Sequence, residues 1–223
     1  MKHDAPEQFS FFRARPSHGV SRGAQHAVVR TQRESHSVVY YFAVLPPDDV
    51  LRGLLRLRQE TVARERIFGR PVTPERLHIS MAPLTRCAPT EVPDFAQDIE
   101  PRADEIASRM TMPAFDVVFD RIQTFNTKDR DEMHRRYYLV LDGSDVPGLL
   151  RLNDLFRQSL VRCGLGTAMP KAFNPHLTLF YANRPIAPRD IAPIQWTVRD
   201  VALVQSFHGQ GRYVVLKRWP LIG

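Results

Sequence analysis

The sequence predicts an α+β fold made of two lobes of similar content. Runs of β-branched and aromatic residues alternate with amphipathic helical segments over residues 38–223, which is typical of mixed domains. Two of the strand-like runs share the pattern His-x-Ser/Thr and lie far apart in the chain, which predicts one such strand in each lobe. The 223 residues, of which 43% are hydrophobic, fit one domain or two small lobes that share a fold.

The first half of this region predicts the order strand, helix, strand, helix, strand. Residues 38–45 form a near-continuous apolar run that favours a central strand, and Pro46 and Pro47 end it. Asp48 and Asp49 then open a helix, because the helix dipole favours acidic side chains in the first turn. The remaining elements of this half are a strand at 77–81, a helix at 94–109 and a strand at 115–122.

The second half predicts a strand, a helix and then three strands. The polar stretch 126–135 predicts a hairpin-like loop. The glycine-rich segment 208–212 indicates a hairpin turn, which we favour over a phosphate-binding loop because a strand follows it and not a helix. The elements of this half are a strand at 137–141, a helix at 147–163, and strands at 175–179, 196–204 and 213–219.

Residues 1–37 differ in composition from the rest of the chain. They are rich in Arg, His, Ser and Gln and contain only scattered apolar residues. We interpret them as an extension that is either loose or draped over the domain at 38–223. A basic arm that touches RNA is the alternative, although a solvated tail is the more common role for such a segment.

Composition favours a cytoplasmic protein with an acidic partner. No run of about eighteen apolar residues is present, which argues against a membrane span, and the N-terminus lacks a secretory signal. Cys87 and Cys163 show neither metal-type spacing nor a disulfide framework, as in proteins with reduced thiols. The formal net charge of +7 favours nucleic acid as the partner, although many arginines are expected on solvated faces. We expect a monomer that does not associate with membranes.

Two segments, 77–81 and 175–179, carry the pattern on which the functional prediction depends. Side chains in a strand alternate between two faces, so the leucines, isoleucine and methionine of these segments point to a core. The opposite face of each strand then carries a histidine and a hydroxyl, namely His78, Ser80, His176 and Thr178. Two such strands predict two half-sites that face one cleft.

A structural role for these histidines is the alternative. A single histidine in a strand is most often a hydrogen-bonded structural residue. Two copies in matching contexts reverse that preference and favour a shared site. A metal site is not expected, because histidine with a hydroxyl is a poor ligand set, and we expect no cofactor.

Four segments together resemble a known family. They are Tyr-Phe-Ala-Val-Leu-Pro-Pro at 41–47, Leu-His-Ile-Ser at 77–80, Asn-Pro-His-Leu-Thr-Leu at 174–179 and Arg-Tyr-Val-Val-Leu-Lys-Arg-Trp-Pro-Leu at 212–221. From Val38 to the C-terminus the chain resembles the 2H phosphoesterase superfamily, in its LigT-like branch of RNA 2′,3′-cyclic phosphodiesterases, also called 2′-5′ RNA ligases. The resemblance implies two pseudo-symmetric lobes, each an antiparallel-rich sheet with helices on its outer face, and an active-site cleft between the lobes.

The resemblance also implies a reaction. His78 and His176 would divide the roles of general acid and general base in hydrolysis of a 2′,3′-cyclic phosphate, because histidine titrates near neutrality. Ser80 and Thr178 would hydrogen-bond the non-bridging phosphate oxygens. The substrate would be an RNA end or a small cyclic nucleotide, and the reverse reaction would form a 2′-5′ linkage. The sequence leaves open which histidine is the acid and which ribose oxygen leaves.

The chain departs from the family pattern in two places. The family has an arginine a few residues after the second histidine, and this chain has Tyr181 there. Ala82-Pro83-Leu84 replaces the usual Phe-Leu-Gly after the first motif. We therefore expect a divergent branch in which another cation contacts the phosphate. The candidates for that cation are Arg86, Arg136, Lys171, Arg184 and Arg212.

Three aromatic residues are candidates for stacking on a base. They are Tyr40, Phe42 and Tyr181, although core packing is the more common fate of aromatic residues in strands. The loss of the arginine at 181 also motivates a second hypothesis from another class. In that hypothesis the chain is an RNA- or nucleotide-binding module of the same fold with weak catalysis.

Overall fold

The protein is described by a computed structural model that covers residues 37–88, 92–126, 137–143, 146–165, 169, 172–208 and 210–222, with backbone alone for 92–97. Residues 1–36 lie outside the described residues, so the predicted extension stays a prediction. The predicted loop at 126–135 lies almost wholly outside them as well, as do Arg136 and Lys171.

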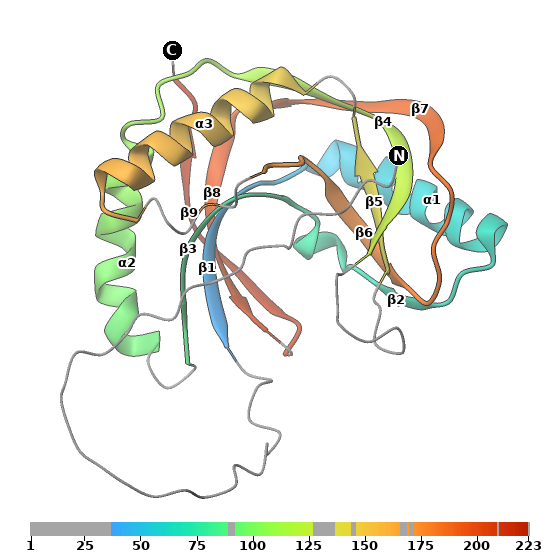
Figure 1. The fold of residues 1–223 in the computed structure, drawn as a ribbon, viewed down its shortest axis with the longest axis horizontal. Helices are drawn as coiled ribbons and strands as arrows, with labels where there is room; N and C mark the ends of the chain where they lie inside the picture. Colours follow the sequence, from blue (N-terminus) through green and yellow to red (C-terminus); the bar gives the residue numbers. More distant parts are fainter. Residues whose placement is uncertain are drawn as a thin grey trace, which may run out of the picture.

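The chain forms three α-helices and nine strands within the described residues (Figure 1). The strands are β1 (Val38–Val44), β2 (Gly69–Pro71), β3 (Ile79–Cys87), β4 (Phe115–Asn126), β5 (Tyr137–Asp142), β6 (Leu177–Ala182), β7 (Arg189–Val198), β8 (Asp200–Phe207) and β9 (Arg212–Pro220). The helices are α1 (Asp48–Glu65), α2 (Val92–Ala107) and α3 (Pro147–Arg162), and a 3₁₀ turn, η1 (Pro74–Arg76), precedes β3.

All nine strands join one sheet in the order β7-β4-β5-β6-β3-β1-β8-β9, with β2 paired to β6. Every pair among these strands is antiparallel. The sheet has two halves, and within the described residues the only registered pair between them is Ile79 on β3 with Leu177 on β6. The predicted α+β architecture of two lobes is thus confirmed, with the lobes as halves of a continuous sheet.

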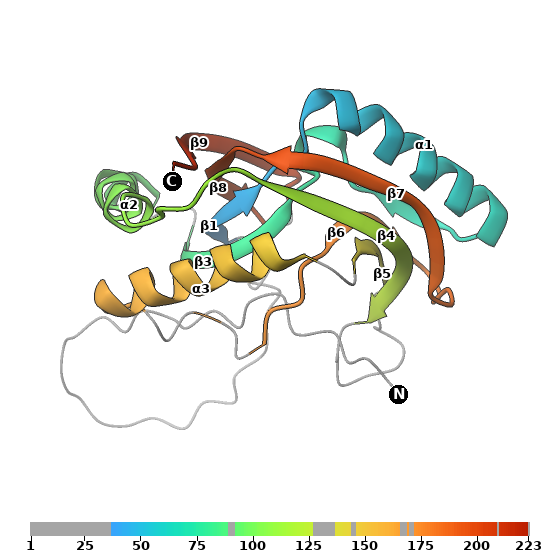
Figure 2. The same ribbon diagram turned by 90° about the horizontal axis from the view of Figure 1, so that it is seen from above.

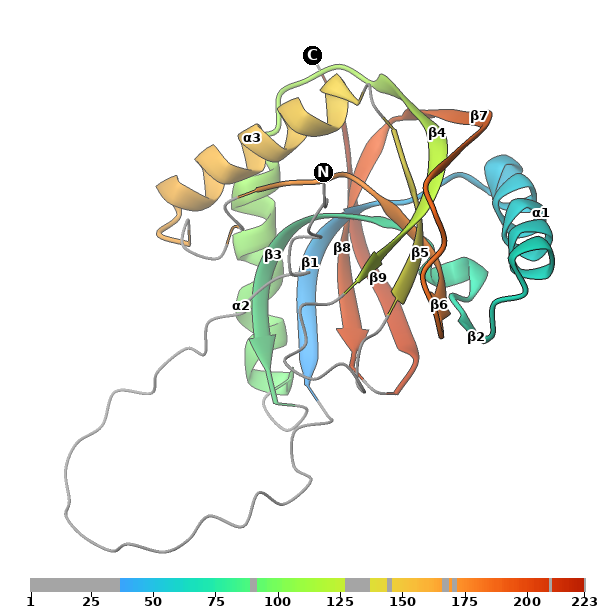
Figure 3. The ribbon, with the colours of Figure 1, turned by 45° about the vertical axis from the view of Figure 1, so that its right-hand side comes forward.

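The two lobes do not correspond to the two halves of the sequence, contrary to the order of elements expected above. One lobe combines β1 and β3 with the last two strands, β8 and β9, and the four run side by side (Figure 3). The other lobe contains β2, β4, β5, β6 and β7. Each lobe therefore mixes early and late segments, so both lobes depend on the whole folded region.

Helix α1 packs on one lobe, α2 on the other, and α3 contacts strands of both (Figure 2). α1 contacts β6 and β7, whereas α2 and α3 contact β3, and α3 also reaches β4. The apolar faces of the helices and sheet form a large core, in which Leu54, Phe119, Phe156 and Leu160 are fully buried. Burial of this apolar surface is the main force that stabilises the two lobes.

Two elements differ from the sequence prediction. The run at 196–204 was expected as one strand, but the chain turns at Arg199 and divides it between β7 and β8. No glycine or proline marks this turn, so the pattern of apolar residues alone did not reveal it. The short strand β2 was also missed, because Gly69 and Pro71 indicate a turn more strongly than a strand.

Both faces of strand β1 are buried, so its aromatic residues pack in the interior of the protein. Tyr40 and Phe42 are fully buried in the main core. The phenol of Tyr40 accepts a hydrogen bond from Gln205, and the ring of Phe42 packs 4.7 Å from that of Phe156. The prediction that Tyr40 and Phe42 stack on a base is therefore wrong. Tyr41, between them, points to the opposite face of the sheet.

None of the helices in the described part of the chain is long and apolar enough to cross a membrane.

The core contact of Phe42 predicts a large loss of stability on truncation. Phe42→Ala should lower the free energy of unfolding by about 3–5 kcal/mol, because it removes a fully buried ring and leaves a cavity. Phe68→Ala is the matched control: this ring is 72% exposed, and its removal should change stability by less than about 0.5 kcal/mol. Urea unfolding followed by circular dichroism measures both. Equal effects of the two substitutions would contradict the assignment of Phe42 to the core.

Candidate active site

The contact between β3 and β6 brings the two sequence motifs together. Ile79 pairs with Leu177 in antiparallel register. Continuing this register by one residue in each direction places His78 opposite Thr178 and Ser80 opposite His176. Side chains directly opposite each other in an antiparallel pair lie on the same face with Cβ atoms about 4.5–5.5 Å apart. The two motifs, separate in sequence, thus form one four-residue cluster.

The predicted alternation of faces is confirmed. Ile79, Met81, Leu177 and Leu179 are completely buried, and Leu77 is 2% exposed. The residues between them are partly exposed on the other face, and these are His78, Ser80, His176 and Thr178. We call this side of the sheet the histidine face.

Both imidazoles are held by the same backbone contact. Nδ1 of His78 donates to the carbonyl oxygen of Arg76 at 2.7 Å, and Nδ1 of His176 donates to that of Asn174 at 2.8 Å. A carbonyl oxygen only accepts, so in each neutral ring Nδ1 carries the hydrogen and Nε2 is the basic nitrogen. The carbonyl two residues before each histidine thus fixes both the tautomer and the ring orientation.

Two hydroxyl groups contact Nε2 of His78. The Ser80 hydroxyl lies at 3.0 Å and the Tyr41 phenol at 3.1 Å, and each can donate to the neutral ring. The ring of Tyr213 lies 5.7 Å from that of His78. Burial raises the pKa of both phenols, so Tyr41 and Tyr213 stay neutral hydroxyl groups. The sequence analysis missed both residues.

His176 lies in a different electrostatic environment. Leu141 on β5 pairs with Leu177, so continuing the register places Asp142 opposite His176. Asp142 is 2% exposed, and both of its oxygens accept hydrogen bonds from Arg121, at 3.0 and 2.9 Å. The edge of the Phe125 ring packs against the imidazole, with centroids 5.1 Å apart. His176 therefore has a carboxylate in its neighbourhood, placed there by the sheet register.

The pKa of each histidine is lowered, chiefly by burial. The pKa of His78 is lowered to about 4, mainly by burial and to a smaller extent by the positive charges of His176 and Arg76, whereas the hydrogen bond to the Arg76 carbonyl opposes the shift. Burial also lowers the pKa of His176, but its hydrogen bond to Asn174 and the negative charge of Asp142 oppose the shift. In the absence of a ligand both rings are thus neutral at pH 7, and His78 is the harder of the two to protonate.

The ring of Tyr181 lies on the histidine face next to a second aromatic ring. It lies opposite Tyr138 on β5, and the two rings meet edge to face with centroids 5.5 Å apart. The guanidinium of Arg70 on β2 lies 5.2 Å from the centroid of the Tyr181 ring. Tyr181 is partly exposed, so a role in contacting a base stays a prediction.

The cations suggested by the sequence lie elsewhere. Arg212 stands 4.4 Å from the centroid of the Phe207 ring, and its neighbour Tyr213 occupies the histidine face, so Arg212 points to the opposite side. Arg86 lies six residues beyond Ser80 on β3, roughly 20 Å along an extended strand. Arg184 donates to the backbone oxygen of Glu65. These positions do not favour Arg212 or Arg86 as the phosphate-binding cation, and that role stays a prediction for both.

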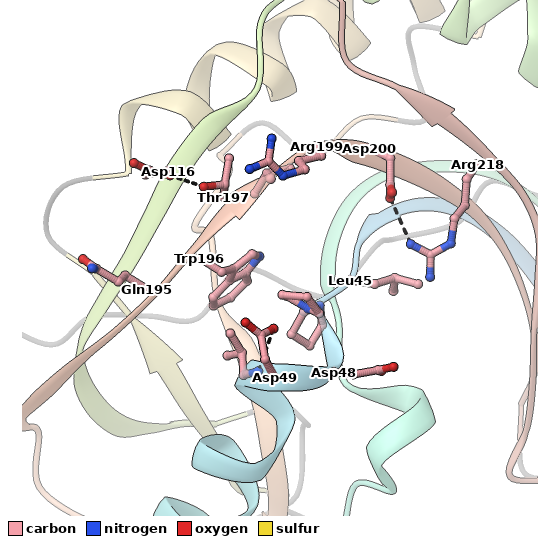
Figure 4. A pocket seen from close by; sticks show the side chains of 14 residues that line it. Leu45, Asp48, Asp49, Asp116, Gln195, Trp196, Thr197, Arg199, Asp200 and Arg218 are labelled. Carbon is pink, nitrogen blue, oxygen red and sulfur yellow. Dashed lines mark hydrogen bonds and ion pairs between the residues drawn. The ribbon is translucent and has the colours of Figure 1, made fainter.

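A separate hollow of about 740 Å³ lies between the start of α1 and the turn from β7 to β8 (Figure 4). Its walls include Trp196, and no residue of the two histidine motifs lines it. The hollow is lined by two arginines and by a larger number of acidic side chains. The acidic residues are Asp48, Asp49, Asp116 and Asp200. Asp116 and Asp200 are hydrogen-bonded to Thr197 and Arg218, at 2.7 and 3.0 Å. The excess of carboxylates makes this hollow unfavourable for a phosphate.

Among the residues that the structure describes, no three His, Cys, Asp or Glu side chains are grouped so that they could hold a metal ion.

The pKa difference between the histidines can be measured directly. In an NMR titration, His78 should titrate near pH 4 and His176 below its ordinary value of about 6.5, because burial disfavours both charged forms. His78→Ala and His176→Ala each remove one signal and so assign both among the eight histidines of the chain. His176→Ala should raise the pKa of His78, since it removes a positive charge from its surroundings. Titration of His78 at or above pH 6.5 would contradict the environment described here.

Comparison with known proteins places the chain in a family. The sequence profile of the 2′-5′ RNA ligase superfamily matches residues 46–209, which is more than half of the chain. No curated protein sequence matches. Among solved structures, the chain is similar to E. coli LigT in apo form, with a TM-score of 0.60 and 24% identity over 85% of this chain and 100% of that one. It is also similar to TT0787 of Thermus thermophilus, with a TM-score of 0.58 and 21% identity over 83% of this chain and 98% of that one. The structural likeness supports the fold, and the profile match identifies the chain as a divergent member of the 2′-5′ RNA ligase superfamily of 2H phosphoesterases.

Proposed function

We propose that the protein is a metal-independent phosphoesterase that hydrolyses the 2′,3′-cyclic phosphate of an RNA end or of a small nucleotide. The observation that carries this proposal is the cluster of two imidazoles and two hydroxyls on the histidine face. Extending the register of the Ile79–Leu177 pair by one residue on each side would set His78 beside Thr178 and His176 beside Ser80. Membership of a superfamily of phosphoesterases and ligases supports the same reaction class.

Hydrolysis of a cyclic phosphate needs two proton transfers. One group takes a proton from the attacking water, and another gives a proton to the ribose oxygen that leaves phosphorus. Two imidazoles on neighbouring strands, each with Nδ1 tied to the backbone, present two Nε2 atoms for these transfers. A phosphate between them is contacted from both sides, as attack opposite a leaving oxygen requires.

The charges around the rings favour His78 as the base and His176 as the acid. His78 has the lower pKa, with Arg76 nearby and no carboxylate among the groups that shift it, so it stays neutral and ready to accept a proton. His176 lies opposite Asp142, whose negative charge favours the protonated ring. In the reverse reaction the roles exchange, and the same groups would form a 2′-5′ linkage.

The hydroxyls supply the contacts to the phosphate oxygens. Ser80 and Thr178 lie on the same face as the imidazoles and can donate to the non-bridging oxygens, where negative charge grows as water attacks. The Tyr41 phenol, 3.1 Å from Nε2 of His78, occupies the direction from which the attacking water has to approach the base. It can therefore hold that water in place once substrate is bound.

The first test is removal of each histidine. His78→Ala and His176→Ala should each lower kcat for nucleoside 2′,3′-cyclic monophosphates by about 10²–10⁴-fold, because each removes one proton-transfer group. The assay contains a chelator, and the product is mapped as a 2′- or 3′-phosphate. His208→Ala, at the exposed turn after β8, is the matched control and should keep its activity. More than a tenth of the wild-type kcat in both active-site variants would refute the paired roles.

A binding module of the same fold is the alternative outcome of this assay. It is motivated by Tyr181, an uncharged residue at a position that was expected to hold a cation, here in contact with Arg70 and Tyr138. Salt-dependent binding of RNA with a terminal phosphate, without any product, would favour this alternative over the phosphoesterase.

The second test concerns the acid and its carboxylate. The pH profile of kcat/KM should be bell-shaped, with an acidic limb near pH 4 from His78 and a basic limb below pH 6.5 from His176. Asp142→Asn should move the basic limb to lower pH, since the negative charge of Asp142 raises the pKa of His176 and its loss removes that support.

The matched control for this test is Asp116→Asn, a carboxylate on β4 that accepts a hydrogen bond from Thr197. It should leave both limbs in place. If Asp142→Asn moves the acidic limb instead, His176 is the base and the proposed roles are reversed. If neither limb moves, Asp142 does not act on the reaction through His176.

A further inference from the structure

Binding of a phosphate ester at the histidine face requires positive charge. The two hydroxyls there are neutral, and the lowered pKa values leave both imidazoles uncharged at pH 7 before a ligand binds. Asp142, opposite His176, forms a bidentate ion pair with Arg121, so this pair brings no net positive charge to the face. A cation must therefore stand close to the two rings.

Arg76 is bound to the catalytic cluster by its own backbone. It is the last residue of η1, two positions before His78, and its carbonyl oxygen accepts the hydrogen bond from Nδ1 of His78 at 2.7 Å. Leu77 between them is buried in the core and fixes the chain on both sides. Any movement of this segment thus moves the arginine and the histidine together.

The Arg76 side chain lacks a partner among the described residues. Its Nε is buried without a hydrogen bond. The carboxylate on which its charge acts, Glu75, is exposed and accepts a hydrogen bond from Thr73. Two other cations are paired with carboxylates, namely Arg121 with Asp142 at 2.9 Å and Lys217 with Asp104 at 2.7 Å. A partly buried guanidinium without a counter-ion is unfavourable, and an anion that pairs with it removes that cost.

The charge of Arg76 acts on the groups that surround His78. It lowers the pKa of Tyr41 and of Tyr213, whose rings flank the imidazole, and it lowers the pKa of His78 itself. The Tyr41 phenol is in turn 3.1 Å from Nε2 of His78. The guanidinium therefore lies within electrostatic range of the His78 ring and of both phenols.

We propose that Arg76 is the phosphate-binding residue of the histidine face, and that its guanidinium pairs with the non-bridging oxygens of a phosphate held between His78 and His176. This inference rests on the proposed function for its substrate, a phosphate ester anion. A guanidinium offers parallel N–H donors that match two phosphate oxygens, which a hydroxyl cannot do. Arg70, on the edge strand β2, is another cation of this face. Its guanidinium already stacks on the ring of Tyr181.

Steady-state kinetics of Arg76→Ala test the role in turnover. With a nucleoside 2′,3′-cyclic monophosphate as substrate, kcat/KM should fall by about 10²–10³-fold, with part of the loss in KM because the ground-state phosphate also loses its partner. Arg76→Lys keeps the charge without the paired donors and should recover part of the loss. Arg52→Ala, which removes an equal charge from the exposed side of α1, is the matched control and should behave as wild type.

The pH profile adds a readout that a purely structural role would not change. Arg76 lowers the pKa of His78, so Arg76→Ala should raise that pKa and move the acidic limb of kcat/KM to higher pH. Thermal melting of each variant shows that the fold is intact, which is expected because the side chain of Arg76 has no partner in the described structure to lose.

Direct binding of inorganic phosphate separates this inference from the proposed function. By isothermal calorimetry, Arg76→Ala should weaken phosphate binding at least tenfold, and Arg52→Ala should not weaken it. If wild-type protein binds phosphate through Arg76 but turns over no cyclic phosphate, the proposed function fails and the assignment of Arg76 stands. Unchanged phosphate affinity in Arg76→Ala, or no phosphate binding by the wild type, would overturn the assignment even if turnover fell.

Discussion

The pairing of Ile79 with Leu177 is the contact on which the candidate site depends. In the part of the chain that the structure describes, it is the only registered pair that joins the two halves of the sheet, and it lies between the histidine and the hydroxyl of each motif. Because both residues point into the core, the flanking side chains of both strands must point to the other face. A slip of one residue in this register would bury the imidazoles and expose the leucine and isoleucine, so core packing protects the geometry of the site.

The strand register also gives the two histidines different electrostatic environments, although the two motifs are otherwise alike. Each histidine donates Nδ1 to the carbonyl two residues earlier, and each is partly buried. What differs is the neighbour on the far side: β5 brings Asp142 to His176, whereas η1 brings Arg76 to His78. A carboxylate at one ring and a guanidinium at the other separate the two roles, although the sequence patterns around the rings are nearly identical.

The sequence predicted the elements and the two motifs because each depends on local alternation. The core face of Leu77, Ile79, Leu177 and Leu179 follows from a period of two in short strands with clear polar partners. That argument fails for β1, where both faces are buried and every residue is apolar or aromatic, so the sequence could not distinguish Tyr41 from Tyr40 and Phe42. The sequence also could not predict contacts that depend on pairing between distant strands, such as those of Asp142 and Tyr213. For the same reason it could not predict that the last strands join the first lobe.

In the reaction that we propose, the two charged neighbours would let a site with neutral rings carry out acid-base chemistry near neutrality. A bound phosphate anion favours the protonated form of any imidazole beside it, so it raises the pKa of both histidines. At His176 this effect adds to that of Asp142, and the ring gains the proton that it must later donate. At His78 the positive charge of Arg76 opposes it, so the base stays unprotonated while the anion is bound. Binding of the substrate then supplies the acid without consuming the base, which two histidines in identical surroundings could not do.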